Sequence, residues 1–406
     1  MAVDVEIRTI AEDEFEAYLT AVEAAFSATP APEDFEQERA LAEYDRCHAA
    51  FDGSEIVGTA AAFTMPFSIP GGELAVPFVT AVGVKATHRR RGINSALMRR
   101  QLEDVHERGE PVAVLYASEA GIYGRFGYGL ASFGLTLDVE TSRTAFVRGY
   151  RPSGSVRLVE RQTAAGQILR VHEVVRRERP GMPGLNEARL AYGLHDHGPD
   201  RDKPMLFVLH EGQDGLDGYA IYRVKHDWEG SLPRSVLDVR DLQAASPGAY
   251  ADLWRYVFDI DLVHRVKAWN RPVDEPLLHL VAEPRRLGAT VMDGLWLRLV
   301  DVAEGLRRRR YAAEGRIVFE VRDRSCPWNE ARYALEGGPG DAACSPSREE
   351  PDLVCTVNDV GAAYLGGTSF RQLHRAGRVE ERSAGSLARA DAMFAWDPAP
   401  WCPHVF

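Results

Sequence analysis

Cysteine and lysine are both scarce in this chain. Its five cysteines are scattered, odd in number and without a C-x-x-C pair, so we expect reduced thiols in a cytoplasmic protein. Lysine supplies only four of the 48 basic residues, a bias that reflects genome composition more than function.

Long apolar runs and several common catalytic motifs are missing as well. No window approaches the ~18 consecutive apolar residues of a membrane span, and the N-terminal stretch MAVDVEIRTIAEDEFEAYL carries acids throughout, unlike a signal or transit peptide. We therefore expect no membrane association. G-x-S-x-G and G-x-x-x-x-G-K are both absent, which removes the commonest hydrolase and nucleoside-triphosphatase classes.

Positive charge is in deficit. The chain has 60 acidic and 48 basic residues, a net charge of −12, which argues against nucleic acid as a partner. The excess of acid suits a cationic small-molecule substrate, although it also has the simpler interpretation of keeping the protein in solution. At 406 residues, 45% of them hydrophobic, the chain is long enough for two or three globular domains.

A strand, a loop and a helix follow one another in the stretch FVTAVGVKATHRRRGINSALMRRQLEDVHERG. Gly92 in the loop allows a ligand to approach the backbone, and the first N–H groups of the helix point outward with the positive end of its dipole. Arg89, Arg90 and Arg91 add positive charge, so the loop predicts a pyrophosphate site. A solvated basic helix start is the alternative interpretation of the same residues.

The next strand, PVAVLYASE, leads into GIYGRFGY, and here the chain resembles the GNAT superfamily of N-acetyltransferases. That family has an R/Q-x-x-G-x-G/A loop followed by a Y-x-x-x-G-F/Y element. Arg89, Gly92 and Asn94 match the loop, and Tyr123, Gly127 and Tyr128 match the later element. Asn94 departs from the small residue that is usual at its position.

Three longer stretches, HRRRG, ASEAGIYGRFGYG and DGLWLR, narrow the resemblance to the Eis family of acetyltransferases. The resemblance implies an α/β (α+β) fold with tandem GNAT-like domains followed by a sterol-carrier-like C-terminal domain. It also implies acetyl-CoA as co-substrate, no metal, and assembly into a homohexamer.

The chain divides on this basis into three domains. Residues 1–150 are expected to bind acetyl-CoA, with FGLTLDV as the closing strand of the domain. Residues 151–289 repeat the order of elements but have ASPG in place of the arginines, so we expect a degenerate GNAT-like domain. Residues 290–406 begin with DGLWLRLVDV and form the sterol-carrier-like domain, in which the stretch 337–350 is expected to be a mobile loop.

Acetyl transfer from a thioester to an amine needs a proton for the departing thiolate. Tyr123 lies four residues before Gly127, where GNAT enzymes place a tyrosine near the sulfur, and its phenol is protonated at neutral pH. The resemblance makes Tyr123 the general acid. Tyr116 and Tyr128 are close rivals for that role, and each of the three tyrosines also has a plain interpretation as a packing residue.

The transfer also needs a base that accepts the amine proton. In Eis-type enzymes the C-terminal α-carboxylate has this role, and the resemblance places it here on Phe406. The apolar tail AWDPAPWCPHVF independently predicts a docked C-terminus, since its aromatic rings are costly to leave in water. His404 is an alternative base, and a tail that merely packs is the plain interpretation.

The resemblance implies a set of cofactor-binding residues that act mostly through backbone groups, with Arg89 outside it. The set comprises Val82, Gly83, Val84, Arg90, Arg91, Gly92, Ile93, Asn94, Ser95, Ser118 and Glu119. The expected acceptor is a polycationic small-molecule amine, similar to an aminoglycoside or polyamine, or a lysine side chain, bound between the first two domains. Charge alone suggests the acids of the stretch 31–38 for its binding, namely Glu33, Asp34, Glu36 and Glu38.

Three other interpretations have weaker support. The triplet His195, Asp196 and His197 lacks a second ligand cluster and is better explained as a polar loop than as a metal site. The run Arg307–Arg310 is expected to complement a helix dipole or stay solvated, and not to bind nucleic acid. A CoA-responsive or lipid-binding carrier with a vestigial acetyltransferase site is the alternative function.

Overall fold

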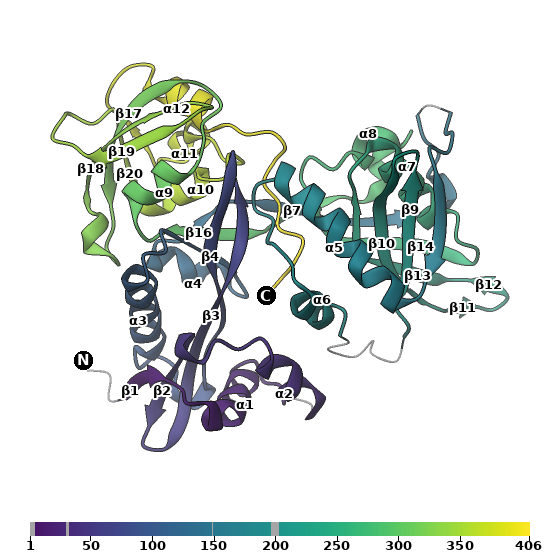
Figure 1. Cartoon of the computed structure of the whole chain (residues 1–406), viewed down its shortest axis with the longest axis horizontal. Coiled ribbons are helices and arrows are strands. Elements are labelled where there is room, and N and C mark those ends of the chain that lie inside the picture. The colour runs from purple at the N-terminus through teal and green to yellow at the C-terminus, as the bar shows by residue number, and fades with distance from the viewer. Residues whose placement is uncertain (1–4, 30–31, 148, 196–202) are drawn as a thin grey trace. The chain divides into compact units, whose positions relative to one another are not determined.

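The computed structural model describes residues 5–29, 32–147, 149–195 and 203–406, and Figure 1 traces the chain. The chain forms two units. The first consists of Met1–Ser132, Leu295–Pro400 and Val405–Phe406, and the second of Phe133–Gly294 and Trp401–His404.

The larger sheet of the first unit has the strand order β1-β2-β3-β4-β5-β16-β6. Its strands are β1 (Glu6–Thr9), β2 (Cys47–Asp52), β3 (Glu55–Ile69), β4 (Gly72–Val84), β5 (Val112–Tyr116), β16 (Leu295–Leu299) and β6 (Gly129–Leu130). Only β4 and β5 run parallel, and the other neighbours are antiparallel. The parallel pair is joined through a helix, as a parallel connection requires.

Helices cover both faces of this sheet. The helix α1 (Phe15–Ala25) packs with Ala49 and Phe51, whereas α3 (Ile93–Glu107) packs with Ala50 between them. Successive strand residues point to opposite faces, so the two helices lie on opposite sides of β2 (Figure 1). Two shorter helices, α2 (Pro32–Arg39) and α4 (Ala120–Tyr123), complete this part of the unit.

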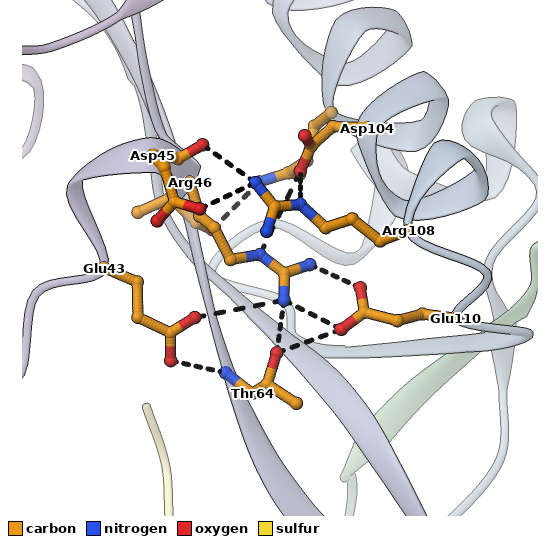
Figure 2. Close-up of polar contacts among 9 residues, drawn as sticks. Glu43, Asp45, Arg46, Thr64, Asp104, Arg108 and Glu110 are labelled. Atoms are coloured by element: carbon orange, nitrogen blue, oxygen red, sulfur yellow. Dashed lines mark hydrogen bonds and ion pairs between the residues drawn. The ribbon is translucent and has the colours of Figure 1, made fainter.

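A buried arginine joins the far end of α3 to the sheet (Figure 2). The Arg46 side chain, only 2% exposed, forms a bidentate pair with Glu110 at 2.9 and 2.6 Å and donates to Thr64 of β3. Next to it, Arg108 pairs with Asp104 of α3 and with Asp45, both at 2.9 Å. These contacts fix the segment that leads from α3 into β5.

The C-terminal part of the first unit has its own sheet, with the order β19-β18-β17-β20-β21. The strands are β17 (Gly315–Arg322), β18 (Ala331–Gly337), β19 (Ala342–Pro346), β20 (Leu353–Thr356) and β21 (Glu380–Glu381). The helices are α9 (Val302–Arg308), α10 (Val357–Ala363), α11 (Phe370–Arg375) and α12 (Ser386–Phe394). A core of packed aromatic rings includes Tyr311, Phe319, Phe370 and Phe394.

One local prediction fails in this part of the chain, and another holds only in part. The stretch 337–350, expected to be a loop, contains β19, because its short Ala-Ala-Cys-Ser run pairs with β18. The run Arg307–Arg310 complements helix ends, as expected, with Arg307 and Arg308 in the last turn of α9, but it is not all solvated. Arg309 is fully buried and donates to the carbonyl oxygens of Tyr364 and Phe394, because backbone acceptors exposed at the ends of α10 and α12 need a donor.

The second unit repeats the arrangement of the first. Its sheet has the order β15-β7-β14-β13-β10-β9-β8, and only β13 and β14 run parallel. The strands are β7 (Phe133–Glu140), β8 (Ser155–Val159), β9 (Leu206–Gly212), β10 (Gly215–Lys225), β13 (Ser235–Ala244), β14 (Val263–Pro272) and β15 (Thr290–Asp293), with a separate hairpin of β11 (Trp228–Glu229) and β12 (Leu232–Pro233). The helices are α5 (Arg161–Glu178), α6 (Glu187–Gly193), α7 (Pro247–Phe258) and α8 (Leu277–Leu280).

Two strands lie in sheets other than those expected. The stretch FGLTLDV, expected to close the first sheet, forms β7 and pairs with β14 and β15 in the second. DGLWLR, expected to open the C-terminal domain, forms β16 and pairs with β5 and β6 in the first. Each sheet therefore receives one inner strand from beyond its own half of the chain, a pairing that strand patterns alone do not specify.

None of the helices in the described part of the chain has both the length and the apolar character needed to cross a membrane.

Candidate active site

The two parallel strands of the first sheet separate where the predicted cofactor residues begin. β4 pairs with β5 only at Phe78 and Val79, although β4 continues to Val84. Its pairing with β3 is also irregular here, and Ala81 has a positive φ of 52°. Among the described residues, the last five of β4 therefore have no partner strand on the side of β5, and their backbone groups can bond an extended ligand.

The three predicted residues of β4 lie in this opening. Val82, Gly83 and Val84 are all half-buried. Gly83 approaches the end of α1 so closely that a Cβ atom would stand 2.6 Å from the Cβ atom of Ala25. A side chain at this position would therefore push α1 away from β4.

The loop that follows β4 ends at the N-terminus of α3. Arg90 and Gly92 both have left-handed backbone conformations, with φ of 64° and 85°, and no side chain caps the helix. No acid lies in its first turn, and Arg90 and Arg91 are exposed. Uncapped N–H groups, the helix dipole and two arginines together favour a doubly charged anion, and the prediction of a pyrophosphate site at this loop stays a prediction.

The remaining residues of the loop have different surroundings. Arg89 donates to the carbonyl oxygen of Ala25 at 3.5 Å, which agrees with its position outside the predicted set. The Ile93 side chain is buried in the core, so this residue offers only its N–H group. Asn94 and Ser95 are half-buried, and the side-chain oxygen of Asn94 is buried without a hydrogen-bond partner in the described part of the chain.

Tyr123 ends α4, shortly after the exposed Ser118 and Glu119. Its side chain is 5% exposed and belongs to the apolar cluster that contains Val79 and Met98. Burial raises the pKa of the Tyr123 phenol, while a hydrogen bond with Ser118 lowers it and the charge of Glu119 raises it. The phenol therefore keeps its proton at neutral pH.

The two rival tyrosines are placed differently. Tyr128 is fully buried, and its hydroxyl has no hydrogen-bond partner among the described residues. Its ring lies edge-on to that of Tyr123, with 6.2 Å between the centroids. Tyr116, at the end of β5, contacts the ring of Phe406. Tyr128 thus has the surroundings of a packing residue, whereas Tyr116 lines the opening between the strands.

Phe406 packs on the sheet at the point where β4 and β5 separate. Its ring meets those of Phe78, Tyr116 and Phe63 edge-on, with centroid distances of 4.6, 5.7 and 5.9 Å. The last residue of the chain is thereby held on β3, β4 and β5 at once. These three ring contacts therefore also restrict the position of the Phe406 α-carboxylate.

Tyr123 and Phe406 approach the opening from opposite faces of the sheet. Phe406 contacts Phe78, while Tyr123 clusters with Val79, and adjacent strand residues point to opposite faces. A thioester placed between the strands would have Tyr123 on one face of the sheet and Phe406 on the other.

In the second unit, the helix that corresponds to α3 is α7, and its N-terminus has a side-chain cap. The Ser246 side chain caps α7, accepting from Ala249, so one of the free N–H groups is already bonded. Nearby, His210 lies between the carboxylates of Asp217 and Asp252, at 2.6 and 2.8 Å. Carboxylates at this point repel an anion, and this arrangement supports our expectation that the second domain binds no CoA.

No group of three or more His, Cys, Asp and Glu side chains among the described residues is arranged to hold a metal ion. His195 is the last residue before a gap in the description, and Asp196 and His197 lie outside the described residues. Of the acids suggested for the acceptor, Glu33, Asp34, Glu36 and Glu38 all fall on α2, where the Glu36 side chain is exposed and those of Asp34 and Glu38 are half-buried.

Sequence reasoning missed the residues that surround the Tyr123 segment. Arg298 of β16 is completely buried, and its guanidinium occupies the space where a side chain at position 127 would lie. Asn358 of α10 donates to the carbonyl oxygens of Gly124 and Tyr128, at 2.7 and 2.9 Å. Arg298 lay within the stretch DGLWLR, which was noted only as a family feature, and Asn358 had no sequence signal.

Comparison with known proteins assigns the chain to a family. Residues 6–131 and residues 186–299 each match an acetyltransferase (GNAT) domain family, and residues 302–403 match a sterol carrier protein domain family. The chain is 43% identical to an uncharacterized N-acetyltransferase of Streptomyces avermitilis, over 99% of both chains. It is 33% identical to the N-acetyltransferase Eis of Mycobacterium tuberculosis, over 95% of this chain and 96% of that one. The chain belongs to the Eis family of GNAT N-acetyltransferases.

The solved structures agree with this membership. The crystal structure of Eis1 from Mycobacterium abscessus superposes with a TM-score of 0.85 at 33% identity, covering 99% of this chain and all of that one. The predicted architecture, two GNAT domains followed by a sterol-carrier-like domain, is confirmed. So is the enzyme class. As a GNAT enzyme of the Eis family, the protein is an N-acetyltransferase and uses an acyl-CoA.

Proposed function

We propose that this Eis-family enzyme transfers acetyl directly from acetyl-CoA to an amine of a polycationic small molecule or to a lysine side chain. The observation that carries the proposal is the opening between β4 and β5, where Phe406 packs against Phe78 and Tyr123 clusters with Val79. The pyrophosphate would bind at α3, and the pantetheine would run along Val82 to Val84. The thioester would then lie near Phe78, where the two strands separate.

Tyr123 would act as the general acid. The neutral amine attacks the thioester carbonyl, a tetrahedral intermediate forms, and its collapse breaks the C–S bond. The phenol then donates its proton to the thiolate of CoA, which avoids release of an unprotonated leaving group. The raised pKa of Tyr123 supports this role because the group is fully protonated before the reaction begins.

The α-carboxylate of Phe406 would act as the general base. It would accept the proton that the amine loses as the new C–N bond forms, leaving an uncharged amide. His404 has less suitable surroundings for this task. It belongs to the second unit, where its imidazole lies beside that of His172 with 5.3 Å between the ring centroids, whereas Phe406 packs on β4 and β5.

The acceptor would be a multiply charged amine of the aminoglycoside or polyamine type. The net charge of −12 creates a field that raises the local concentration of such a cation. Acids of α2, among them Glu36, would contribute to that field. We also infer a homohexamer in the cytoplasm from the family resemblance, and sedimentation equilibrium would test the hexamer.

The decisive experiment follows the release of free thiol from acetyl-CoA in the presence of a panel of amines. The panel should contain an aminoglycoside, a polyamine, a lysine peptide and a neutral alcohol as control. Turnover with one or more amines and none with the alcohol is the expected result. No turnover with any amine, together with tight binding of a lipid, would instead support the carrier function.

A further inference from the structure

The segment that contains Tyr123 is held by side chains from the sterol-carrier-like region. We define this segment, residues 119–128, as the tyrosine loop. Asn358 of α10 spans it by donating to the carbonyl oxygens of Gly124 at 2.7 Å and Tyr128 at 2.9 Å. Ser325 donates to the carbonyl oxygen of Arg125 at 3.1 Å. Three carbonyl groups of the loop are thus bonded from more than 190 residues further along the chain.

These contacts reach the acid from its C-terminal side by two routes. Gly124 directly follows Tyr123, and the N–H group of Tyr128 donates to the Tyr123 carbonyl oxygen at 3.3 Å. A single Asn358 amide group therefore bonds to the residue after Tyr123 and to the residue whose backbone returns to it. Movement of Asn358 would be transmitted to Tyr123 through the peptide bond to Gly124 and through the hydrogen bond from the Tyr128 N–H group.

The underside of the loop is fixed by a buried ion pair. Arg298 fills the space next to Gly127 and pairs with Asp323 at 2.5 Å, both side chains being almost completely buried. Asp323 also accepts from the backbone N–H groups of Ser325 and Cys326, each at 3.1 Å. The residue that contacts the loop through its hydroxyl, Ser325, is therefore itself held by the partner of Arg298.

Close backbone packing leaves α10 little freedom against this loop. A Cβ atom at Gly361 would lie 2.5 Å from the carbonyl oxygen of Leu297, and one at Gly129 would lie 2.6 Å from the backbone nitrogen of Ala362. Only glycine at these two positions permits such an approach. α10 is thus seated directly on β6 and β16, next to the C-terminal end of the tyrosine loop.

We propose that the sterol-carrier-like region serves the transfer reaction as a rigid support for the tyrosine loop, with Asn358 as a positioning residue that fixes the Tyr123 phenol. The proposal rests on the proposed function of Tyr123. Proton donation requires the phenol within hydrogen-bonding reach of the sulfur, and small displacements of a reacting group cost rate steeply. Most of the predicted acetyl-CoA contacts lie on β4 and on the loop at α3, so the loss of Asn358 should leave binding of acetyl-CoA nearly unchanged.

The test is a double-mutant cycle between Asn358→Ala and Tyr123→Phe, with kcat and the KM for acetyl-CoA measured at a saturating amine. Asn358→Ala should lower kcat about tenfold with little change in KM. In the Tyr123→Phe background the same substitution should have almost no further effect, because the group that it positions is already gone.

The matched control is Ser369→Ala. Ser369 caps α11 in the same region by accepting from Gln372 and does not touch the loop, so its loss reduces stability while kcat should stay unchanged. If Asn358→Ala folds poorly, Ser325→Ala removes the neighbouring contact and should lower kcat by a smaller factor, again only when Tyr123 is present.

The outcomes separate the two proposals. A slow Tyr123→Phe enzyme with unchanged kcat in both Asn358→Ala and Ser325→Ala overturns the supporting role but leaves the general acid in place. Effects of Asn358→Ala and Tyr123→Phe that multiply also overturn it, since they show independent actions. If Tyr123→Phe alone retains full activity, the proposed function of Tyr123 fails, and the supporting role fails with it.

Discussion

Tyr123 must keep its proton until the C–S bond breaks, and its buried position, which raises the pKa of the phenol, keeps it protonated at neutral pH. Replacing it with phenylalanine removes the proton and keeps the ring that packs against Tyr128. We expect Tyr123→Phe to lower kcat by about 100-fold, as general acid catalysis implies, with a nearly unchanged KM for acetyl-CoA. Steady-state kinetics at saturating amine would measure both. An unchanged kcat would transfer the role to another donor.

The carboxylate of Phe406 can act as a base only while it is the last group of the chain. Three residues added after Phe406 should convert it to a peptide carbonyl and lower kcat by at least about 100-fold, while acetyl-CoA still binds. Isothermal titration with CoA would confirm the binding. The same three residues added before Met1 form the matched control and should have no effect. Full activity of the extended enzyme would exclude this base.

The C-terminal residues Trp401–His404 should make the stability of the protein depend on pH. Trp401 donates to the carbonyl oxygen of Asn270, and Asn270 donates to that of Cys402, both at 2.8 Å. Two residues further on, the pKa of His404 is lowered to about 4 from 6.5, by burial first and then by His172. The unfolded chain therefore takes up this proton more readily than the folded one, and stability falls as the pH decreases from 6.5 towards 4.

We expect the free energy of unfolding to decrease by about 2 kcal/mol over this range because of His404. Urea unfolding at several pH values would measure the decrease, and His404→Gln should reduce it. An identical acid dependence in the variant would assign the effect to other groups, among them His172, whose pKa burial also lowers.

Single residues differ in how far the sequence reveals them. Tyr123 and Phe406 were predicted because a motif and a chain end mark their positions, although their roles stay predictions. Arg298 and Asn358 contact the tyrosine loop only after folding. An asparagine near the start of an ordinary helix has no feature that distinguishes it from a solvated residue.

At the scale of elements, the position of α3 depends on both of its ends. Its first turn forms the anion site, and the segment after its last turn is tied to β3 by Arg46, Thr64 and Glu110 (Figure 2). The Arg46 side chain is 2% and that of Glu110 14% exposed. Loss of Arg46 would leave the Glu110 carboxylate poorly hydrated and without a partner of opposite charge.

Arg46→Met should therefore lower the free energy of unfolding by about 3 kcal/mol, at the lower end of the range for broken buried ion pairs. Urea denaturation gives the value directly. Arg307→Met is the control, since Arg307 is half exposed in its pair with Glu304 and its loss should cost less than about 1 kcal/mol. Adding Glu110→Gln to Arg46→Met should recover part of the stability, whereas a further loss would contradict this account.

Secondary structure followed from the sequence more reliably than strand pairing did. The strands β4 and β5 and the helix α3 all formed where periodicity predicted them. β7 and β16 also formed as strands, but each joined the other sheet. Alternation of apolar residues determines that a strand is half-buried, whereas its neighbour depends on contacts far away in sequence.

At the scale of the whole molecule, net charge should influence the acceptor more than the chemistry. A net charge of −12 attracts a polycation over a distance that shrinks from about 10 Å at 0.1 M salt to about 3 Å at 1 M. With saturating acetyl-CoA, we expect the KM for a polyamine to rise several-fold between these salt concentrations, at nearly constant kcat. A monoamine substrate should show a much smaller rise, and equal rises would argue against long-range attraction.

The placement of β16 in the first sheet also determines when that sheet can be completed during synthesis. The ribosome releases β5 and β6 early, but β16, the strand that lies between them, begins only at Leu295. Until then the inner edge of β5 is exposed, and such an edge invites pairing with other chains. The arginine beside Gly127 arrives on the same late strand. A nascent chain therefore carries the anion-binding loop long before it can hold its tyrosine in place.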